Sequence, residues 1–446
     1  MVAGVSTLHP AITTIRRAEW QLCRDAMEGE GAIKARGDHY LIEPTGYSTL
    51  EPDSRKAAYR SYLSRAIFPN WMAASVGAMI GIIHGREINI TIPDAMMYLW
   101  EDADGQGLPL EAFHRRITRE MLIIGSYAVL TDAPRDGGDP YMVGYRRDKV
   151  INWDNDWWVL DETTMRRDGF AWEQLERYLV LGIGEGGYAP ILMDETGQLL
   201  EEIQVRARGG GFLPRIPFAI GNALDLSPRI EAPPLIGIAR AALDYYQMSA
   251  DQRIALYMGA NPTLLVINGE APQAVGAGVV HVMNGTSDLE PDMRYVEATN
   301  GGVVERRAEM QCAQQQAVMA GARLFEQTAA GQESGEAKRL RYASETATLV
   351  SIAQNSCLLL ERSLKNVAMI MGLPENDIVV EAPTDLMDRT LSPTEFAALF
   401  GVYAQGGMSW ETYFRNGQRG GVFSPEDTAE DEAARLDAPL STDDAV

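Results

Sequence analysis

The sequence predicts an α+β protein built from several parts, and three patterns support this fold class. Amphipathic helical stretches and short β-rich segments are interspersed up to about residue 228. Two helical stretches of nearly equal length then enclose a small β-rich module. A run without glycine or proline, 336–371, carries helical periodicity. The 446 residues, 46% of them apolar, suffice for two or three domains with a sizeable core.

Residues 1–228 are predicted to form a mixed α+β domain. Helices are expected over Arg55–Ile67, over Pro69–Ile83, where the proline opens the first turn, and over Leu110–Leu122, where apolar residues recur at helical spacing. β-Branched and aromatic residues bounded by Gly, Pro and Asp predict four strands. These strands are Tyr127–Thr131, Trp157–Asp161, Arg177–Leu181 and Gln204–Arg206.

The middle of the chain predicts two helices joined through a β module. The helices are Leu235–Met258 and Val303–Thr328. The chain leaves the first helix and enters the second on the same side of the module, so we expect the two helices to lie antiparallel. Glycines and prolines between them separate three expected strands. These strands are Thr263–Ile267, Val279–Met283 and Arg294–Ala298.

The last part of the chain is predicted to be helical. A glycine-bounded loop, Ala329–Gly335, leads into the helix Ser334–Met371, which Gly372 and Pro374 end. Two short helices are expected over Pro393–Tyr403 and Trp410–Asn416. The tail from Ser424 carries eight acidic residues against one arginine, so we predict that it is disordered.

Charge and cysteine content exclude several classes of protein. The net charge is -23, from 39 Lys+Arg against 62 Asp+Glu, which argues against a protein that grips phosphates along a basic groove. Three distant cysteines indicate a reducing compartment and no disulfide framework. The charged first thirty residues do not resemble a signal peptide, and the apolar run Trp71–Ile83 is too short to span a membrane.

A glycine-rich segment raises the possibility of a nucleotide-binding enzyme. Gly182–Gly187 matches the G-x-G-x-x-G fingerprint, and Glu202 follows at the expected distance. Because Tyr188-Ala189-Pro190 then leads into another extended stretch rather than a helix, we favour a glycine-rich hairpin. An oxidoreductase that binds a nicotinamide cofactor here remains the alternative.

Other motifs give no support for catalysis, so the chain is predicted not to be an enzyme and to need no cofactor or metal. Walker, H-E-x-x-H and G-x-S-x-G patterns are missing from the sequence. We expect Cys312 and Cys357 to be core residues and the five histidines to lie at the surface or its boundary. Trp153, Trp157 and Trp158 are interpreted as a hydrophobic corner at a turn, with a stacking platform for bases or sugars as the alternative.

Several local stretches, in this order, resemble the portal proteins of tailed bacteriophages. The resemblance runs from about Arg55 to about Leu436, and no single stretch carries it alone. The stretches are Arg60–Ala66 with Pro69-Asn70, Phe113–Leu130, Lys149–Trp153, Ile216–Phe218, Met319–Leu324 and Ser344–Thr346.

The resemblance implies a division of the chain into named parts. The parts are a wing (1–228), a first stem helix (229–258), a clip (259–302), a second stem helix (303–328), a tunnel loop (329–335), a long wing helix (336–372), a small helical crown (373–423) and the acidic tail (424–446). By position in this architecture, the tunnel loop would face DNA and the clip would dock other proteins. The expected DNA-facing residues are Gln332, Glu333, Ser334 and Lys338, and the expected docking residues are Thr263, Leu265, Val280, Val282 and Tyr295.

The resemblance also implies a function and partners. The chain would form a homo-oligomeric ring, usually a dodecamer, at one capsid vertex of the virion after assembly in the host cytoplasm. Double-stranded DNA would pass through it without sequence readout. Its partners would be the terminase large subunit, the major capsid and scaffolding proteins and a head-tail adaptor. The basic cluster Lys338, Arg339 and Arg341 would contact DNA phosphates or acidic residues of a neighbouring subunit. A non-viral oligomeric scaffold is the remaining alternative.

Overall fold

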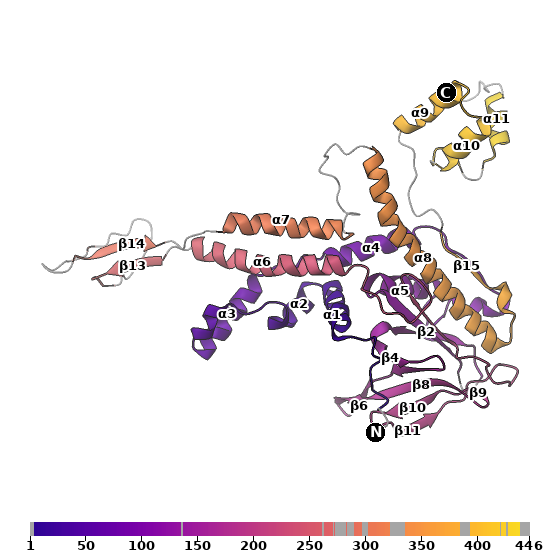
Figure 1. The fold of residues 1–446 in the computed structure, drawn as a ribbon, viewed down its shortest axis with the longest axis horizontal. Helices are drawn as coiled ribbons and strands as arrows, with labels where there is room; N and C mark the ends of the chain where they lie inside the picture. The colour runs from indigo at the N-terminus through magenta and orange to yellow at the C-terminus, as the bar shows by residue number, and fades with distance from the viewer. Residues whose placement is uncertain are drawn as a thin grey trace. The chain divides into compact units, whose positions relative to one another are not determined.

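The computed structural model is α+β, as predicted, and consists of two compact units, Met1–Ala382 and Pro383–Val446 (Figure 1). The described residues are 4–134, 137–260, 263–270, 272, 282, 290–296, 302–321, 335–383, 393–419, 421–424 and 427–437.

Five helices occupy the N-terminal part of the first unit. They are α1 (Thr14–Glu28), α2 (Glu30–Ala35), α3 (Pro52–Arg65), α4 (Trp71–His84) and α5 (Leu110–Ile123). Short 3-10 turns cover Gly37–His39, Thr45–Thr49, Asp94–Trp100, Arg147–Lys149 and Glu375–Asp377. The three predicted helices are present, with one correction. Helix α4 begins at Trp71 after Asn70, so Pro69 precedes the helix instead of opening it.

Two antiparallel sheets form the β part of this unit. Strand β2 (Ser126–Asp132) lies between β12 (Phe218–Asn222) and β3 (Tyr141–Arg146). The second sheet has the order β11-β10-β8-β5-β4, with β9 paired to β8. Its strands are β4 (Val150–Trp153), β5 (Trp157–Asp161), β8 (Arg177–Gly184), β9 (Gly187–Tyr188), β10 (Ile191–Asp194) and β11 (Leu199–Glu202). Side chains from both sheets share one core with Ile370.

One predicted strand is wrong. Residues Gln204–Arg206 form no strand, and Arg206 makes an isolated bridge to Phe212. The chain turns back at once through Gly209–Gly211, where the Ala207 amide donates to the Gly211 carbonyl at 2.9 Å. A two-stranded hairpin that the sequence did not predict, β6 (Thr164–Asp168) and β7 (Ala171–Leu175), follows β5. Strand β1 (Asn89–Thr91) pairs with β15 (Val379–Glu381).

The predicted helix pair and long helix are present. Helix α6 (Ile236–Ala260) and helix α7 (Val303–Met319) enclose the hairpin of β13 (Thr263–Ile267) and β14 (Asp292–Val296). The prediction that α7 continues to Thr328 is wrong, because Gly321, with φ +121°, leaves the helical conformation. The expected strand Val279–Met283 lies outside the described residues apart from Val282.

Helix α8 (Gly335–Met371) is continuous over 37 residues, and Gly372, with φ +72°, ends it as the sequence predicted. It packs on α5 and on the sheet of β2 and β12. No described helix is long and apolar enough to cross a membrane.

The second unit is helical. It contains α9 (Pro393–Ala404), α10 (Trp410–Arg419) and α11 (Ala429–Asp437) around an aromatic core. Helix α11 corrects the prediction of a disordered tail for 429–437. Thr428 caps this helix: the Asp431 amide donates to its Oγ1 at 3.1 Å, and the same hydroxyl donates to the Asp431 carboxylate at 2.7 Å. Trp410 Nε1 also donates to the Ala429 carbonyl at 2.8 Å, which attaches α11 to α10.

Candidate functional site

The glycine-rich segment is a β-hairpin, which confirms the favoured interpretation. Ile183 pairs with Tyr188 and Gly184 with Gly187. A dinucleotide site needs a helix to begin at the third glycine, so that its amides can bind the phosphates. Here Gly187 begins strand β9, and a Cβ at this position would lie 2.6 Å from the Leu213 carbonyl oxygen. The geometry therefore contradicts a dinucleotide phosphate site at Gly182–Gly187, on which the oxidoreductase alternative was based.

The α6/α7 pair is antiparallel, as predicted. Gly237, near the start of α6, lies beside Ala320, at the end of α7, where a Cβ on the glycine would approach the Ala320 Cβ to 2.8 Å. At the other end, Arg306 of α7 donates from Nη1 to the Asp251 carbonyl of α6 at 3.1 Å. Helix α7 buries Ala313 and Ala317 against its partner. Small side chains at these positions allow the two helices to approach closely.

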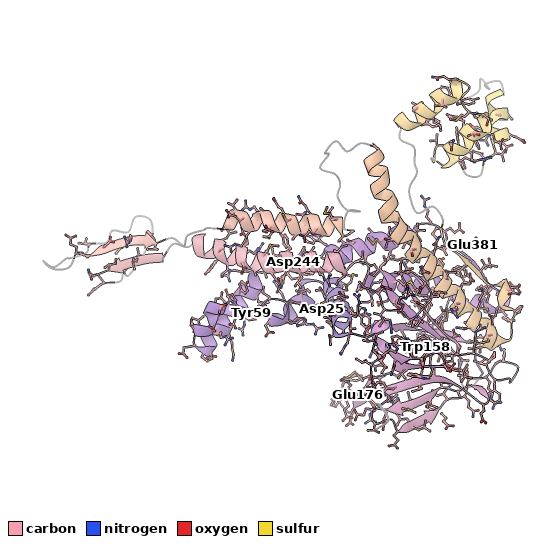
Figure 2. All side chains as sticks on the ribbon, viewed as in Figure 1. Asp25, Tyr59, Trp158, Glu176, Asp244 and Glu381 are labelled. Carbon is pink, nitrogen blue, oxygen red and sulfur yellow. The ribbon has the colours of Figure 1, made fainter. Side chains whose placement is uncertain are left out.

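The first fifty residues, which sequence reasoning could not interpret, hold α6 in place. Arg240 pairs with Glu19 of α1 at 2.6 Å, and Gln247 donates to the Tyr40 carbonyl at 2.8 Å. Helix α3, which follows these fifty residues, adds a third contact, because Tyr62 donates to the Asp251 carboxylate at 2.6 Å. Figure 2 shows the helices that carry these groups along α6, with Asp244 labelled on α6 and Tyr59 on α3. Sequence reasoning missed the contact between Glu19 and Arg240 because the two residues lie 221 positions apart in the chain.

Helix α7 presents a polar surface with many uncharged amides. Its side chains Gln311, Gln314, Gln315 and Gln316 are exposed. Cys312 is also exposed, so the prediction that it is a core residue is wrong. It lines a hollow between the two helices, beside Ala313 and Gln316 of α7 and Asp244 of α6. Neutral amides can donate and accept hydrogen bonds without holding a phosphate electrostatically.

The hairpin β13–β14 separates the predicted docking residues between its two faces. Leu265 pairs with Arg294 in the register, while Tyr295 pairs with Leu264. Neighbouring residues of a strand point to opposite faces, so Leu265 and Tyr295 cannot form one contact surface on this hairpin. Both side chains are exposed, as is Val282. Thr263 begins β13, and Val280 lies outside the described residues.

The predicted tunnel loop falls outside the described residues. This applies to Gln332, Glu333 and Ser334. Lys338, Arg339 and Arg341 belong to helix α8, but their side chains are not among those described. The described residues stop at Gly321 and resume at Gly335.

A buried His-His-Cys contact joins α4, α5 and α8. The rings of His84 and His114 lie 4.9 Å apart, and His114 Nε2 is 3.2 Å from the Ser356 hydroxyl and 3.8 Å from the Cys357 sulfur. His114 is fully buried, so the prediction of a surface or boundary position is wrong for this histidine. Burial lowers the pKa of His114 to about 3 and that of His84 to about 4.

This buried contact does not form a reactive centre. Burial raises the pKa of the Cys357 thiol to about 12, so the sulfur stays protonated near neutral pH and is a poor nucleophile. Cys357 is a core residue, as predicted. Among the described residues, no group of three or more His, Cys, Asp or Glu side chains is placed to hold a metal ion.

The tryptophan cluster forms a packed corner at the β4–β5 turn, which confirms the prediction. Trp158 packs on Phe218, with ring centroids 4.9 Å apart. Trp153 stacks on His9 at 3.8 Å and lies 4.4 Å from the guanidinium of Arg147. Arg147 is buried, and its guanidinium donates to the Val150 carbonyl at 2.7 Å. The rings are therefore occupied by protein contacts and do not form a free stacking platform.

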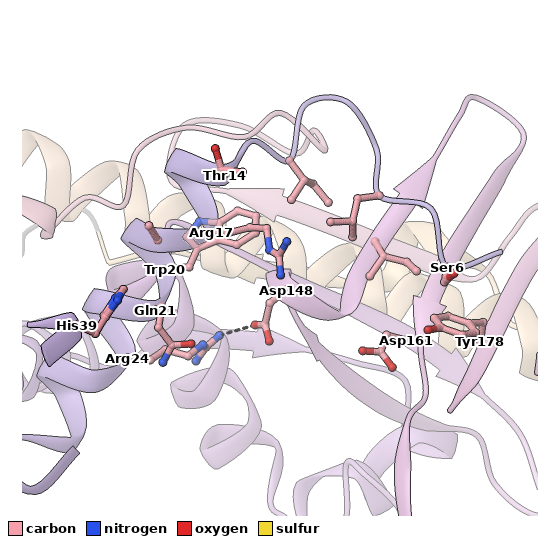
Figure 3. A pocket seen from close by; sticks show the side chains of 14 residues that line it. Ser6, Thr14, Arg17, Trp20, Gln21, Arg24, His39, Asp148, Asp161 and Tyr178 are labelled. Atoms are coloured by element: carbon pink, nitrogen blue, oxygen red, sulfur yellow. Dashed lines mark hydrogen bonds and ion pairs between the residues drawn. The ribbon is translucent and has the colours of Figure 1, made fainter. Parts of the chain in front are cut away.

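A cleft of about 570 Å³ opens between α1, the preceding N-terminal segment and the β4–β5–β8 part of the sheet (Figure 3). Apolar side chains and aromatic rings line much of it. These are Leu8, Ile12, Trp20, Ile151 and Tyr178. Arg17 lies at the cleft on the exposed side of α1, and Arg24 binds Asp148 at 2.9 Å beside it. No sequence motif marks this cleft, because its walls come from three distant segments.

Comparison with known proteins gives one family match and several structural likenesses. Residues 234–371, from α6 to the end of α8, match a family described as "Domain of unknown function (DUF4055)", and the match covers less than a third of the chain. A search of curated protein sequences found no match.

The similar solved structures come from gene transfer agent (GTA) particles. A chain of the "Neck of native GTA particle computed with C12 symmetry" is 14% identical, with a TM-score of 0.38 over 77% of this chain and 88% of that one. A chain of the "Virion of native gene transfer agent (GTA) particle" is 12% identical, with a TM-score of 0.42 over 80% and 92%. A chain of the "Neck of empty GTA particle computed with C6 symmetry" is 13% identical, with a TM-score of 0.41 over 78% and 90%. At this level of similarity they carry no argument about function.

Proposed function

We propose that the chain is the portal subunit of a tailed phage or of a particle derived from one. It forms a ring at one capsid vertex, through which double-stranded DNA is packaged and later released. The observation that carries the proposal is the order of the parts: a mixed α+β domain, an antiparallel helix pair whose connection is the hairpin β13–β14, and the continuous helix α8 returning over the sheet.

The charge of the chain supports a channel through which DNA slides. Each phosphate that a protein neutralises releases counterions and adds affinity, which would resist movement. A chain of net charge -23 with amide side chains exposed on α7 avoids this resistance. Contacts with DNA are therefore weak, sensitive to salt and independent of sequence.

The proposal assigns roles to two regions. The loop residues Gln332, Glu333 and Ser334, with Lys338 at the start of α8, face the DNA. The hairpin region docks the terminase motor and then the head-tail connectors, with Leu265 on one face and Tyr295 on the other. The other proposed docking residues are Thr263, Val280 and Val282. The exposed apolar side chains of this hairpin support a docking role, because large exposed apolar groups mark contact surfaces.

Electron microscopy of the purified full-length chain tests the proposal. We expect class averages with rotational symmetry and a central pore of roughly 20 Å or more, which is the width that B-DNA needs. The isolated ring should bind short duplexes weakly, and the binding should disappear at high salt. A compact monomer or dimer that persists on co-expression with capsid and scaffolding proteins would overturn the proposal, as would tight, saturable binding of short duplexes.

A further inference from the structure

The β6–β7 hairpin is an ordered arm that extends beyond the β5–β8 ladder. Five residue pairs hold it, from Thr164 opposite Leu175 to Asp168 opposite Ala171. Gly169, with φ +61°, opens the two-residue turn, and this is the conformation that a type II′ hairpin turn requires at its first central position. The turn therefore fixes the register, and with it the direction of each side chain.

Large apolar side chains are exposed on one face and at the tip of this arm, beside the polar Arg167 and Gln174. The register places Met165, Arg167 and Trp172 on the same face. Met165 is 55% exposed, Trp172 63%, and Phe170 at the tip 100%. A two-stranded hairpin on its own is marginally stable in water, and exposed aromatic side chains of this kind are typical anchors of protein interfaces. The exposed side chains of the arm are therefore of the kind that docks onto another protein surface.

The cleft beside α1 is a complementary receptor. Its apolar lining and its volume of about 570 Å³ suit an inserted aromatic side chain. Arg17 at the cleft is exposed and makes no ion pair with any described residue. Asp168, two residues before Phe170, is likewise exposed and unpaired within the described part of the chain. Exposed apolar side chains of the arm thus have an apolar cleft to enter, and Asp168 and Arg17 carry opposite charges. The neighbouring Arg167 donates to the Gly169 carbonyl within the arm at 2.6 Å.

Within one chain the two surfaces do not meet, because Phe170 is fully exposed. Two different complementary surfaces on one chain define a head-to-tail contact, which produces either a closed ring or an open filament. We propose that the β6–β7 arm of each subunit docks into the α1 cleft of the next subunit around the ring, with Phe170 as the anchor and Asp168 paired with Arg17. This inference rests on the proposed ring and names the contact that closes it.

Cross-linking between copies tests the contact directly. In a Cys312→Ser background, the double variant Arg17→Cys/Asp168→Cys is treated as assembled rings with a short bismaleimide. We expect a ladder of covalent oligomers that extends to the closed ring. A mixture of the two single variants should stop at dimers, because each copy then offers one reactive half of the contact. Asp156→Cys, on the exposed β4–β5 turn, replaces Asp168→Cys as the matched control.

The result separates the two proposals. Rings seen in micrographs without a ladder, or with an equal ladder from the Asp156→Cys control, would overturn the docking contact and leave the ring intact. If the wild-type chain forms no rings, either purified or on co-expression with capsid and scaffolding proteins, the proposed function itself is overturned, and the contact with it.

Charge reversal and truncation give an independent test. Arg17→Asp and Asp168→Arg should each raise the concentration needed for ring formation by roughly tenfold, and the two together should restore it. Asp156→Arg makes the same charge change elsewhere and should have no effect. Phe170→Ser should weaken assembly at least as much, while Ile42→Ser, which removes another exposed apolar side chain, should not. Failure of the double variant to recover, or equal effects of the controls, would contradict the contact.

Discussion

Glu19 of α1 and Arg240 of α6 form an ion pair, with 2.6 Å between Oε1 and Nη2, and this pair fastens the N-terminal helix to the first helix of the antiparallel pair. Glu19 is largely buried and also binds Arg16 at 2.5 Å. Both arginines are partly exposed, so solvent screens the interaction. The Glu19 carboxylate therefore accepts hydrogen bonds from two arginines, Arg16 and Arg240.

Replacing this carboxylate should loosen the attachment of α6. We expect Glu19→Gln to lower the free energy of unfolding by about 1–2 kcal/mol, since two arginines lose their charged acceptor beside a buried group. Urea unfolding followed by circular dichroism measures this. The exposed pair Arg208–Asp139 supplies the control, because Asp139→Asn should change stability by about 0.5 kcal/mol or less. Equal losses in the two variants would show that burial of Glu19 has no special importance.

The periodicity of apolar residues predicted the positions of individual helices and strands. Helices α5, α6 and α8 and strands β5 and β13 have the expected positions, because their side-chain patterns repeat at 3.6 or 2 residues. The strand expected at Gln204–Arg206 is missing, since the glycines at 209–211 turn the chain before a ladder can form. The arm β6–β7 was missed because its strands are exposed on both faces and show no alternation of apolar and polar residues.

Tertiary contacts could not be predicted in the same way. The burial of His114 depends on α4 and α8, whose sequences lie far from it, and nothing in its neighbours along the chain indicates this. The cleft beside α1 needs Trp20, Ile151 and Tyr178 to converge from three segments. Pair contacts of this kind are set by packing, and a single sequence carries no record of them.

Close packing of α6 on α7 gives a prediction about glycine. Gly237→Ala should destabilise the first unit by about 1–3 kcal/mol, because the new Cβ would lie 2.8 Å from that of Ala320. Thermal unfolding measures the loss, and adding Ala320→Gly should recover most of it. In α4, Gly81 has no atom within 4 Å of an added Cβ, so Gly81→Ala should stabilise the protein by about 0.5–1 kcal/mol. Destabilisation at both sites would indicate a general effect of alanine and contradict the packing argument.

The buried His114 predicts a loss of stability in mild acid. The pKa of His114 lies near 3 in the folded chain and near 6.5 in the unfolded chain, so below pH 6.5 the unfolded state binds the proton first. Stability due to the neutral ring is therefore complete above pH 6.5 and falls as the pH drops toward 3. At pH 4.5 the expected loss is about 2–3 kcal/mol.

Urea unfolding at pH 7 and at pH 4.5 measures this loss. His114→Gln keeps a polar side chain but does not titrate, so the difference between the two pH values should shrink by most of that amount. The exposed His39→Gln serves as the control and should leave the difference unchanged. An identical pH dependence in His114→Gln and the wild type would contradict the assignment.

The cysteines differ in their expected reactivity. Cys312 is exposed, whereas Cys23 and Cys357 are buried, and burial raises the pKa of each buried thiol to about 12. A thiol reagent added to the native monomer should therefore label one cysteine rapidly, and Cys312→Ser should abolish this labelling. Mass spectrometry of tryptic peptides identifies the labelled residue. Rapid labelling of Cys357 would show that α8 opens from α5 in the native state.

The glycine-rich hairpin makes the last prediction, which separates its structural role from a nucleotide-binding one. Gly187 has φ +99°, and a Cβ there would lie 2.6 Å from the Leu213 carbonyl oxygen, so Gly187→Ala should destabilise the protein by about 2–3 kcal/mol. Gly182 has open space and an ordinary φ, so Gly182→Ala should be neutral or slightly stabilising. Fluorescence titration of the wild type with a nicotinamide cofactor should give no saturable signal, because no helix begins at Gly187 to bind a phosphate. Saturable binding that Gly184→Val abolishes would contradict the structural role and reinstate a ligand site at this turn.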